Sequence, residues 1–117
     1  LLLEAGALAA AQNIPMQVFT RLMERESGLQ RPLKHRFVER LQAGDFSGGM
    51  STVNARKDSS LILETARALD IPLFAIPAVH AAYEIAVAEG LGSLDYASMG
   101  QLWEKWLDTT YFNEKSD

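Results

Sequence analysis

The sequence of 117 residues contains no cysteine. Disulfide bonds, thiolate catalysis and cysteine-based zinc sites are therefore excluded, and a cytoplasmic location is expected. Basic residues are in the minority, because 11 Lys and Arg stand against 15 Asp and Glu for a formal net charge of −4. A general nucleic-acid binder needs a basic face that displaces counterions from phosphates, so we expect no nucleic-acid partner and disfavour a helix-turn-helix DNA binder.

Long apolar runs are absent too, and none approaches the ~20 residues that cross a bilayer. The opening segment, 1–12, is mostly apolar, but it contains Glu4 and has no basic leader. It is typical of a helix entered midway rather than of a signal peptide. Because the chain lacks an initiating Met and begins inside this apolar pattern, we interpret it as a fragment of a longer protein that has no membrane partner.

Apolar residues recur at helical spacing in almost every segment, and no alternating strand pattern is present. With 48% hydrophobic residues, a chain of this length can form one core. The predicted fold class is all-α, a single bundle-like domain over 1–117 with about six helices and short connections. The helices are expected over 1–12, from Pro15 to near Gly28, from Pro32 to Gly44, through Lys57 to Leu69, over 78–89, and from Asp95 to Leu107.

Apolar stripes on these helices predict which side chains point inward. The residues expected inside are Val18, Phe19, Leu22, Met23, Leu33, Phe37, Val38, Leu41, Leu61, Ile62, Ala66, Leu69, Met99, Leu102, Trp103, Trp106 and Leu107. Segment 78–89 is apolar nearly all round, so we expect it in the middle of the bundle, covered on several sides. Segment 45–49 is the clearest loop, Gly44 and Gly90 are placed to end helices, and Asp95 is a good N-cap.

Two histidines raise the question of a metal site. His35 has Glu39 four residues on, and His80 has Glu84, but neither has a second histidine nearby. A His-x-x-x-Glu pair alone is a weak metal signal, so no metal site is predicted. We expect His35 to be solvated in a basic stretch with Arg36, and His80 to be a hydrogen-bonded core histidine. The aromatic residues near the end of the chain favour a core or a dimer interface over a stacking platform.

Several short motifs follow one another in a fixed order along the chain, and this order can be compared with that of known families. They are Gly44-Asp45-Phe46-Ser47, then Lys57-Asp58, then a helix ending before Pro72-Leu73, then Ala86-Val87-Ala88-Glu89-Gly90-Leu91-Gly92-Ser93-Leu94-Asp95. From about Leu3 to Leu107 the chain resembles the 3-hydroxyisobutyrate dehydrogenase family, a family of β-hydroxyacid dehydrogenases. It departs from the family pattern at Ala97-Ser98, which is usually Ser-Ala, and at Ser59-Ser60, where an apolar residue is common.

The resemblance implies a fold like the 6-phosphogluconate dehydrogenase C-terminal domain. It implies the helical, dimerising and cleft-lining C-terminal domain of an enzyme that oxidises a small β-hydroxyacid with NAD or NADP. In that family a Rossmann domain comes first and binds most of the dinucleotide. The catalytic lysine would lie upstream of Leu1, so we expect no catalytic residue here and an inactive fragment. The Gly90–Asp95 run follows a helix and lacks a third glycine, so we reject it as a nucleotide motif.

Lys57 is the main candidate site residue. It shares a helical face with Leu61 and Asn54, and it extends an apolar stripe with a positive charge. The resemblance implies that Lys57 contacts the nicotinamide end of the cofactor, with Asn54 as a second candidate. The alternative is a surface lysine paired with Asp58 or Asp45.

Two acidic residues are expected to have structural roles. Asp58 is expected to favour the helix dipole from the first turn, and Asp95 to act as an N-cap without a catalytic role. Gly48 and Gly49 would either line the cleft or make the loop flexible. The rival function is a non-enzymatic helical interaction or dimerisation domain, and in either case we expect a homo-oligomer.

Overall fold

The computed structural model of the chain describes residues 2–24, 31 and 33–109. Every regular element over those residues is a helix, so the predicted all-α fold class is confirmed. The described part contains one strand-like contact, an isolated antiparallel bridge between Ser51 and Asp95. None of the described helices is both long enough and apolar enough to span a membrane.

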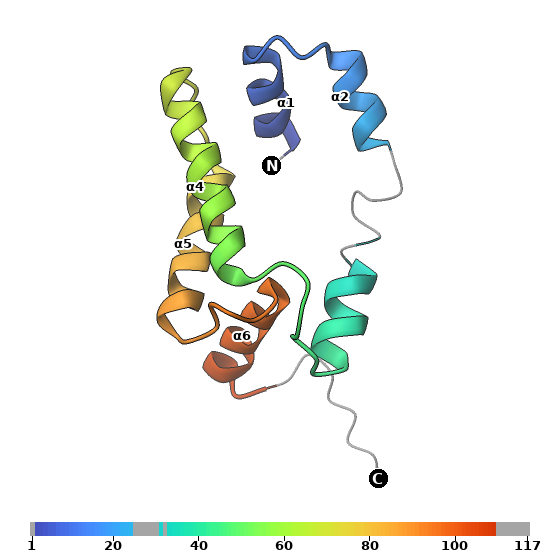
Figure 1. The fold of residues 1–117 in the computed structure, drawn as a ribbon, viewed down its shortest axis with the longest axis vertical. Helices are drawn as coiled ribbons and strands as arrows, with labels where there is room; N and C mark the ends of the chain where they lie inside the picture. The colour runs from blue at the N-terminus through green and yellow to red at the C-terminus, as the bar shows by residue number, and fades with distance from the viewer. Residues whose placement is uncertain (1, 25–30, 32, 110–117) are drawn as a thin grey trace.

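The helices follow the predicted order (Figure 1). They are α1 (Leu2–Ala11), α2 (Met16–Met23), the π-helix η1 (Leu33–Gln42), α4 (Thr52–Ala68), α5 (Ala75–Ala88), the 3-10 helix η2 (Tyr96–Met99) and α6 (Gly100–Leu107). Pro15 was expected in the first turn of α2 and is instead its N-cap, one residue earlier, while Pro77 lies in the first turn of α5. The predicted end of the second helix near Gly28 lies outside the described residues.

Helices α4 and α5 pack side by side as an antiparallel pair, along the left side of Figure 1. The buried side of α4 consists of small residues, namely Thr52, Ala55, Ser59 and Ala66. The buried residue of α5 is Ala86. Small side chains let two helix backbones approach closely, because the distance between helix axes depends on the side chains at the contact. The pair therefore packs tightly while burying little apolar volume.

Helix α1 is attached to this pair by Glu4. The Glu4 carboxylate is buried and accepts hydrogen bonds from the backbone N–H groups of Phe74, Ala75 (2.5 Å) and Ile76 (3.3 Å) at the start of α5. Helix α5 has no side-chain cap from its own N-cap residue, so Glu4 satisfies donors that would otherwise be unpaired. Burial raises the pKa of Glu4, but the three hydrogen bonds lower it by more, and the net pKa lies below the ordinary value.

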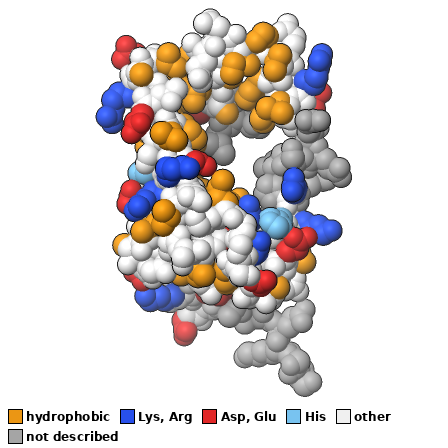
Figure 2. Space-filling view, in the orientation of Figure 1, with side chains coloured by type: hydrophobic (Ala, Val, Ile, Leu, Met, Phe, Trp, Pro, Cys, Tyr) orange, Lys and Arg blue, Asp and Glu red, His pale blue; other side chains and the backbone are white. Residues whose placement is uncertain are grey.

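The predicted core is largely wrong. Among the residues expected inside, Ala66 and Leu102 are buried, and Phe19, Leu41, Ile62 and Met99 are half-buried. The exposed ones are Val18, Leu22, Met23, Phe37, Val38, Leu61, Leu69, Trp103, Trp106 and Leu107. The side chain of Leu33 lies outside the described part. Figure 2 shows hydrophobic side chains gathered on the surface over α1 and α2.

The physical reason is that the helices do not gather around one centre. The radius of gyration is 16.4 Å, whereas a compact chain of this length has about 13 Å. The expectation that α5 is covered on several sides is also wrong, because Ile85 is 45% exposed and Ala78, Ala81 and Ala88 share that exposed side. An apolar stripe indicates which face prefers to be covered, but it does not specify a neighbour, and the described residues leave most of these faces exposed.

Candidate functional site

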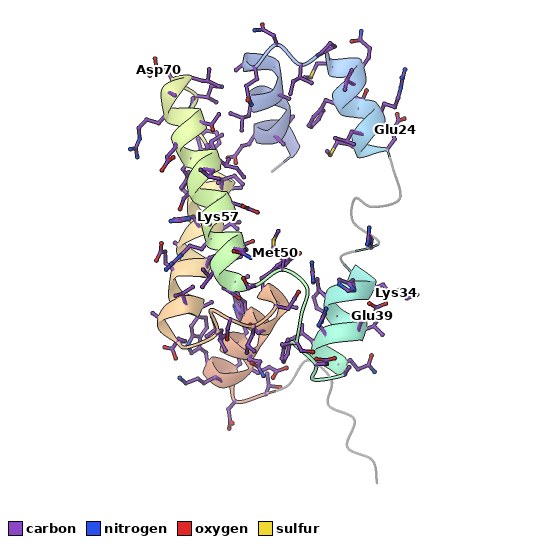
Figure 3. All side chains as sticks on the ribbon, in the orientation of Figure 1. Glu24, Lys34, Glu39, Met50, Lys57 and Asp70 are labelled. Carbon is purple, nitrogen blue, oxygen red and sulfur yellow. The ribbon has the colours of Figure 1, made fainter. Side chains whose placement is uncertain are left out.

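Lys57 lies on the outer face of α4, where it is labelled in Figure 3. At 100° per residue this face is opposite the buried side that packs on α5. The Lys57 side chain is 63% exposed and its Nζ lies 3.4 Å from Asp58 Oδ1. Asn54 and Leu61 are also exposed, so the predicted shared face exists and is uncovered. Of the two alternative partners proposed for Lys57, the Asp58 pair forms.

The expected role of Asp58 at the start of the helix is wrong. Asp58 is not in the first turn, because α4 begins at Thr52 and contains no acidic residue in that turn. Its carboxylate therefore lies too far along the helix to favour the dipole at the N-terminus, where that effect is confined to about one turn. Asp45 instead accepts hydrogen bonds from the hydroxyl (2.5 Å) and N–H (2.9 Å) of Ser47, and these lower the pKa of Asp45.

The N-terminus of α4 is docked onto the loop that follows α5. The Thr52 N–H donates to Leu94 O at 2.8 Å, and the Val53 N–H donates to Gly92 O at 3.0 Å. The next amide, that of Asn54, donates to the side chain of Ser51 at 3.2 Å. Helix N-termini leave their first N–H groups without intrahelical partners. Here two of those donors are satisfied by backbone carbonyls from about 40 residues later, so the loop determines where α4 begins.

Asp95 joins this loop to the rest of the fold. Its side chain is fully buried. Oδ1 accepts the Ala97 N–H at 2.9 Å, which confirms the predicted N-cap, although the capped helix is the 3-10 helix η2. Oδ2 accepts the Met50 N–H at 3.1 Å and an N–H of Arg36 Nη1 at 2.8 Å. The second oxygen thus makes contacts that the sequence did not indicate.

Arg36 was expected in a solvated basic stretch, and that expectation is wrong. Its side chain is only 20% exposed, and it pairs with Asp95 across 59 positions in the sequence. The guanidinium also stacks on the ring of Tyr96, 4.1 Å from the centroid, as arginine commonly does on aromatic faces. Tyr96 in turn meets Tyr83 edge-on at 6.4 Å. Burial, with Tyr96 adding to it, raises the pKa of Tyr83.

The loop before α4 is ordered by backbone geometry and by Arg40. Gly48 and Gly49 have φ of +67° and +66°, in the left-handed region that favours glycine. The Arg40 side chain donates to the carbonyl oxygens of Asp45 (3.3 Å) and Ser47. The glycines therefore form a defined turn, and their presence is explained by conformation rather than by flexibility.

His80 is the hydrogen-bonded histidine that we predicted. Its Nδ1 lies 2.7 Å from Ser59 Oγ on α4, and its Nε2 lies 3.2 Å from Glu84 Oε1. His35 is at the surface and pairs with Glu39, whose pKa this hydrogen bond lowers. In the part of the chain that the structure describes, no group of three or more His, Cys, Asp or Glu side chains could hold a metal ion.

Residues 1–103 match the protein family described as NAD-binding of NADP-dependent 3-hydroxyisobutyrate dehydrogenase. The chain belongs to this family. The match includes Lys57, Asp95 and the docked start of α4, and it confirms the family resemblance and NAD(P) as the cofactor. The chain is accordingly related to the hydroxyacid dehydrogenases.

The chain is also similar to 2-(hydroxymethyl)glutarate dehydrogenase of Eubacterium barkeri. The two are 25% identical over 104 residues, which is 89% of this chain and 35% of that protein. The chain thus spans about a third of the length of the curated relative that it matches.

Proposed function

We propose that this chain is the helical C-terminal domain of a longer enzyme that oxidises a small β-hydroxyacid with NAD or NADP. The names of both related dehydrogenases support this substrate class. In 3-hydroxyisobutyrate and in 2-(hydroxymethyl)glutarate, a primary alcohol lies on the carbon β to a carboxylate. We therefore assign a 2-substituted 3-hydroxypropanoate as substrate. A bound cofactor would accept a hydride from the carbinol carbon, and a lysine upstream of Leu1 would take the hydroxyl proton.

The observation that carries this proposal is the uncovered face of α4 with Lys57 at its centre. A cation, the Asn54 amide and the apolar Leu61 side chain fit the polar edge and flat ring of a nicotinamide. The described residues contain no strand that could lead into a Gly-rich phosphate loop. This domain would therefore supply one wall of the cofactor site, where Lys57 and Asn54 would bind and orient the nicotinamide group. The Rossmann domain would bind the remainder of the dinucleotide.

The uncovered apolar faces are proposed to pair two copies of the chain. Trp103, Trp106 and Leu107 on α6 are 41%, 53% and 67% exposed, and the two indole rings meet edge-on at 5.6 Å. Exposed aromatic clusters of this kind mark interaction sites. Light scattering of the full-length protein should give a dimer or a larger homo-oligomer, which Trp106→Glu dissociates. We also propose a cytoplasmic location, which the lack of cysteine in these 117 residues fits.

Lys57→Ala in the full-length protein tests the cofactor contact, and Lys105→Ala is the matched control. Both lysines are exposed, at 63% and 68%, and both pair with a surface carboxylate. Such pairs contribute about 0–1 kcal/mol to stability, so neither change should move the melting temperature appreciably. Loss of a hydrogen bond from a charged group to the cofactor should weaken binding or turnover about ten-fold or more, for Lys57→Ala only. Equal kinetics in the two variants would defeat the assignment.

The rival function, a non-enzymatic interaction domain, also fits the exposed apolar faces. The full-length protein should be assayed with NAD and NADP against a panel of 3-hydroxy acids that differ at carbon 2. Turnover of at least one of them supports the enzyme. No turnover and no dinucleotide binding, together with a stable oligomer, would favour the interaction domain. A Gly-rich turn and a lysine followed by paired asparagines upstream of Leu1 would support the enzyme independently.

A further inference from the structure

We infer that Arg36 is a positioning residue for the cofactor contact. Its buried ion pair with Asp95 fixes the N-terminus of α4 and so determines where Lys57 is presented. The inference rests on the proposed function, since it assumes that Lys57 meets the cofactor. Arg36 lies on η1, and no described ion pair or hydrogen bond joins it to Lys57 or Asn54.

Lys57 lies between two points at which α4 is anchored to the rest of the fold. The N-terminal anchor is the pair of backbone hydrogen bonds from Thr52 and Val53 to the loop after α5. The second anchor is the hydrogen bond between Ser59 and His80, which ties α4 to α5. Lys57 lies in the turn between them. Its placement therefore depends on the N-terminal anchor, because helix ends fray where their first N–H groups lose their partners.

Asp95 holds the N-terminal anchor of α4 in place. Leu94, which accepts both the N–H and the hydroxyl of Thr52, immediately precedes Asp95. The Asp95 N–H donates to Phe46 O at 2.9 Å, and its carboxylate accepts the Met50 N–H on the other side. Asp95 thereby clamps the segment before α4 and the loop after α5 against each other. A displacement of Asp95 would move both halves of the anchor.

The positive charge of Arg36 stabilises the buried Asp95 carboxylate. The carboxylate is fully buried, and among the described ion pairs Arg36 is the cation that contacts it. An ionised carboxylate without a charged partner is disfavoured in the interior, so loss of Arg36 draws the carboxylate toward water and away from the Met50 and Ala97 amides that also bond it. Arg36 is further fixed by stacking on Tyr96, which a lysine at this position could not reproduce. Helix η1 thus controls the start of α4 through one guanidinium.

The test is a double-mutant cycle in the full-length protein, with Arg36→Gln, Lys57→Ala and both together. The cofactor dissociation constant is measured by titration with NAD and NADP. Arg36→Gln should raise it by about 2- to 30-fold, the usual range for coupling through a scaffold. In the Lys57→Ala background, Arg36→Gln should have no further effect. Arg67→Gln, an exposed arginine in the last turn of α4, is the control and should leave the constant unchanged.

Hydrogen exchange provides a readout that does not involve the cofactor. Arg36→Gln should speed exchange of the Thr52 and Val53 amides and leave amides in the second half of α4 unchanged. Where Arg36→Gln does not fold, Arg36→Lys takes its place, with a smaller change in the same direction. The inference is overturned if the dissociation constant is unchanged, if the two substitutions multiply independently, or if the two amides stay protected. A Lys57→Ala variant with normal affinity contradicts the proposed function instead, and the exchange data still report on the anchor.

Discussion

Gly49 packs directly against Asp95. A Cβ atom at position 49 would overlap Oδ2 of that carboxylate and lie 3.0 Å from Nη2 of Arg40. Gly48 has nearly the same backbone conformation, but nothing lies within 4 Å of the corresponding point. The two neighbouring glycines therefore separate the cost of a left-handed backbone from the cost of crowding a buried ion pair.

Gly48→Ala should destabilise the protein by about 1 kcal/mol, the usual cost of a left-handed conformation for a residue with a Cβ. Gly49→Ala pays the same cost and also displaces the Asp95 carboxylate, so a loss of about 3 kcal/mol or more is expected. Urea unfolding of the two variants measures the difference. Equal losses would mean that Asp95 can move away without penalty, which would also weaken its role as the clamp at the start of α4.

Ser59→Ala should remove the polar link between α4 and α5. The Ser59 hydroxyl donates to Arg56 O at 2.8 Å and lies 2.7 Å from His80 Nδ1. Without it, a part-buried ring nitrogen loses its partner, at a cost of about 1–3 kcal/mol. Ser60→Ala is the matched control, because that hydroxyl bonds only the carbonyl of Arg56 at 3.1 Å and its loss should cost about 0.5 kcal/mol or less. A Ser59→Ala variant as stable as Ser60→Ala would contradict the role of the link.

Glu4→Gln should lower the melting temperature at neutral pH and weaken the pH dependence of stability. The folded-state pKa of Glu4 is depressed. Its stabilisation is therefore present above the unfolded-state pKa and is lost as the pH falls through the folded value. Wild type should lose stability below about pH 4.5, and Glu4→Gln should lose less over the same interval. Glu64→Gln, on the exposed side of α4, is the control and should behave as wild type.

Tyr83 should ionise above the ordinary tyrosine range of about pH 10. Its pKa is raised first by burial, then by the proximity of Tyr96 and, to a smaller extent, of the Asp58 carboxylate. The raised value means that stability is present below the unfolded-state pKa and is lost as pH rises through the folded one. Ultraviolet titration of wild type minus Tyr83→Phe isolates this group. Asp58→Asn should move its transition to lower pH, and an unchanged transition would show that the carboxylate is too distant to act.

The features that the sequence predicted are those that depend on residues close together along the chain. The helical periodicity, the Asp95 cap of η2 and the common face of Asn54, Lys57 and Leu61 all follow from spacings of two to seven residues. The start of α4 at Thr52, earlier than the predicted start near Lys57, did not follow from them. The cofactor contact of Lys57 stays a prediction. Arg36 and Asp95 are separated by 59 positions, and nothing local indicates that they meet.

The two larger errors have the same origin. Glu4 is an isolated acid in an apolar helix, and that is the only signal that could have suggested a buried role. Its partners begin 70 positions later, so the backbone that it caps could not be identified. The apolar stripes on α2 and α6 predict a core because periodicity specifies a face and not its neighbour. Among the described residues, Leu102 on α6 is buried, whereas most of both stripes is exposed.

The composition of the small core has a mechanical consequence. Six hydrophobic residues are buried in the part of the chain that the structure describes, and five of them are alanines, namely Ala9, Ala55, Ala66, Ala86 and Ala97; the sixth is Leu102. Alanine has no side-chain rotamer to adjust. Helices α4 and α5 meet through such residues. With so little apolar volume between them, the two helices are held to each other by close backbone packing and by the polar contacts of Ser59 with His80 and of Arg56 with Glu84.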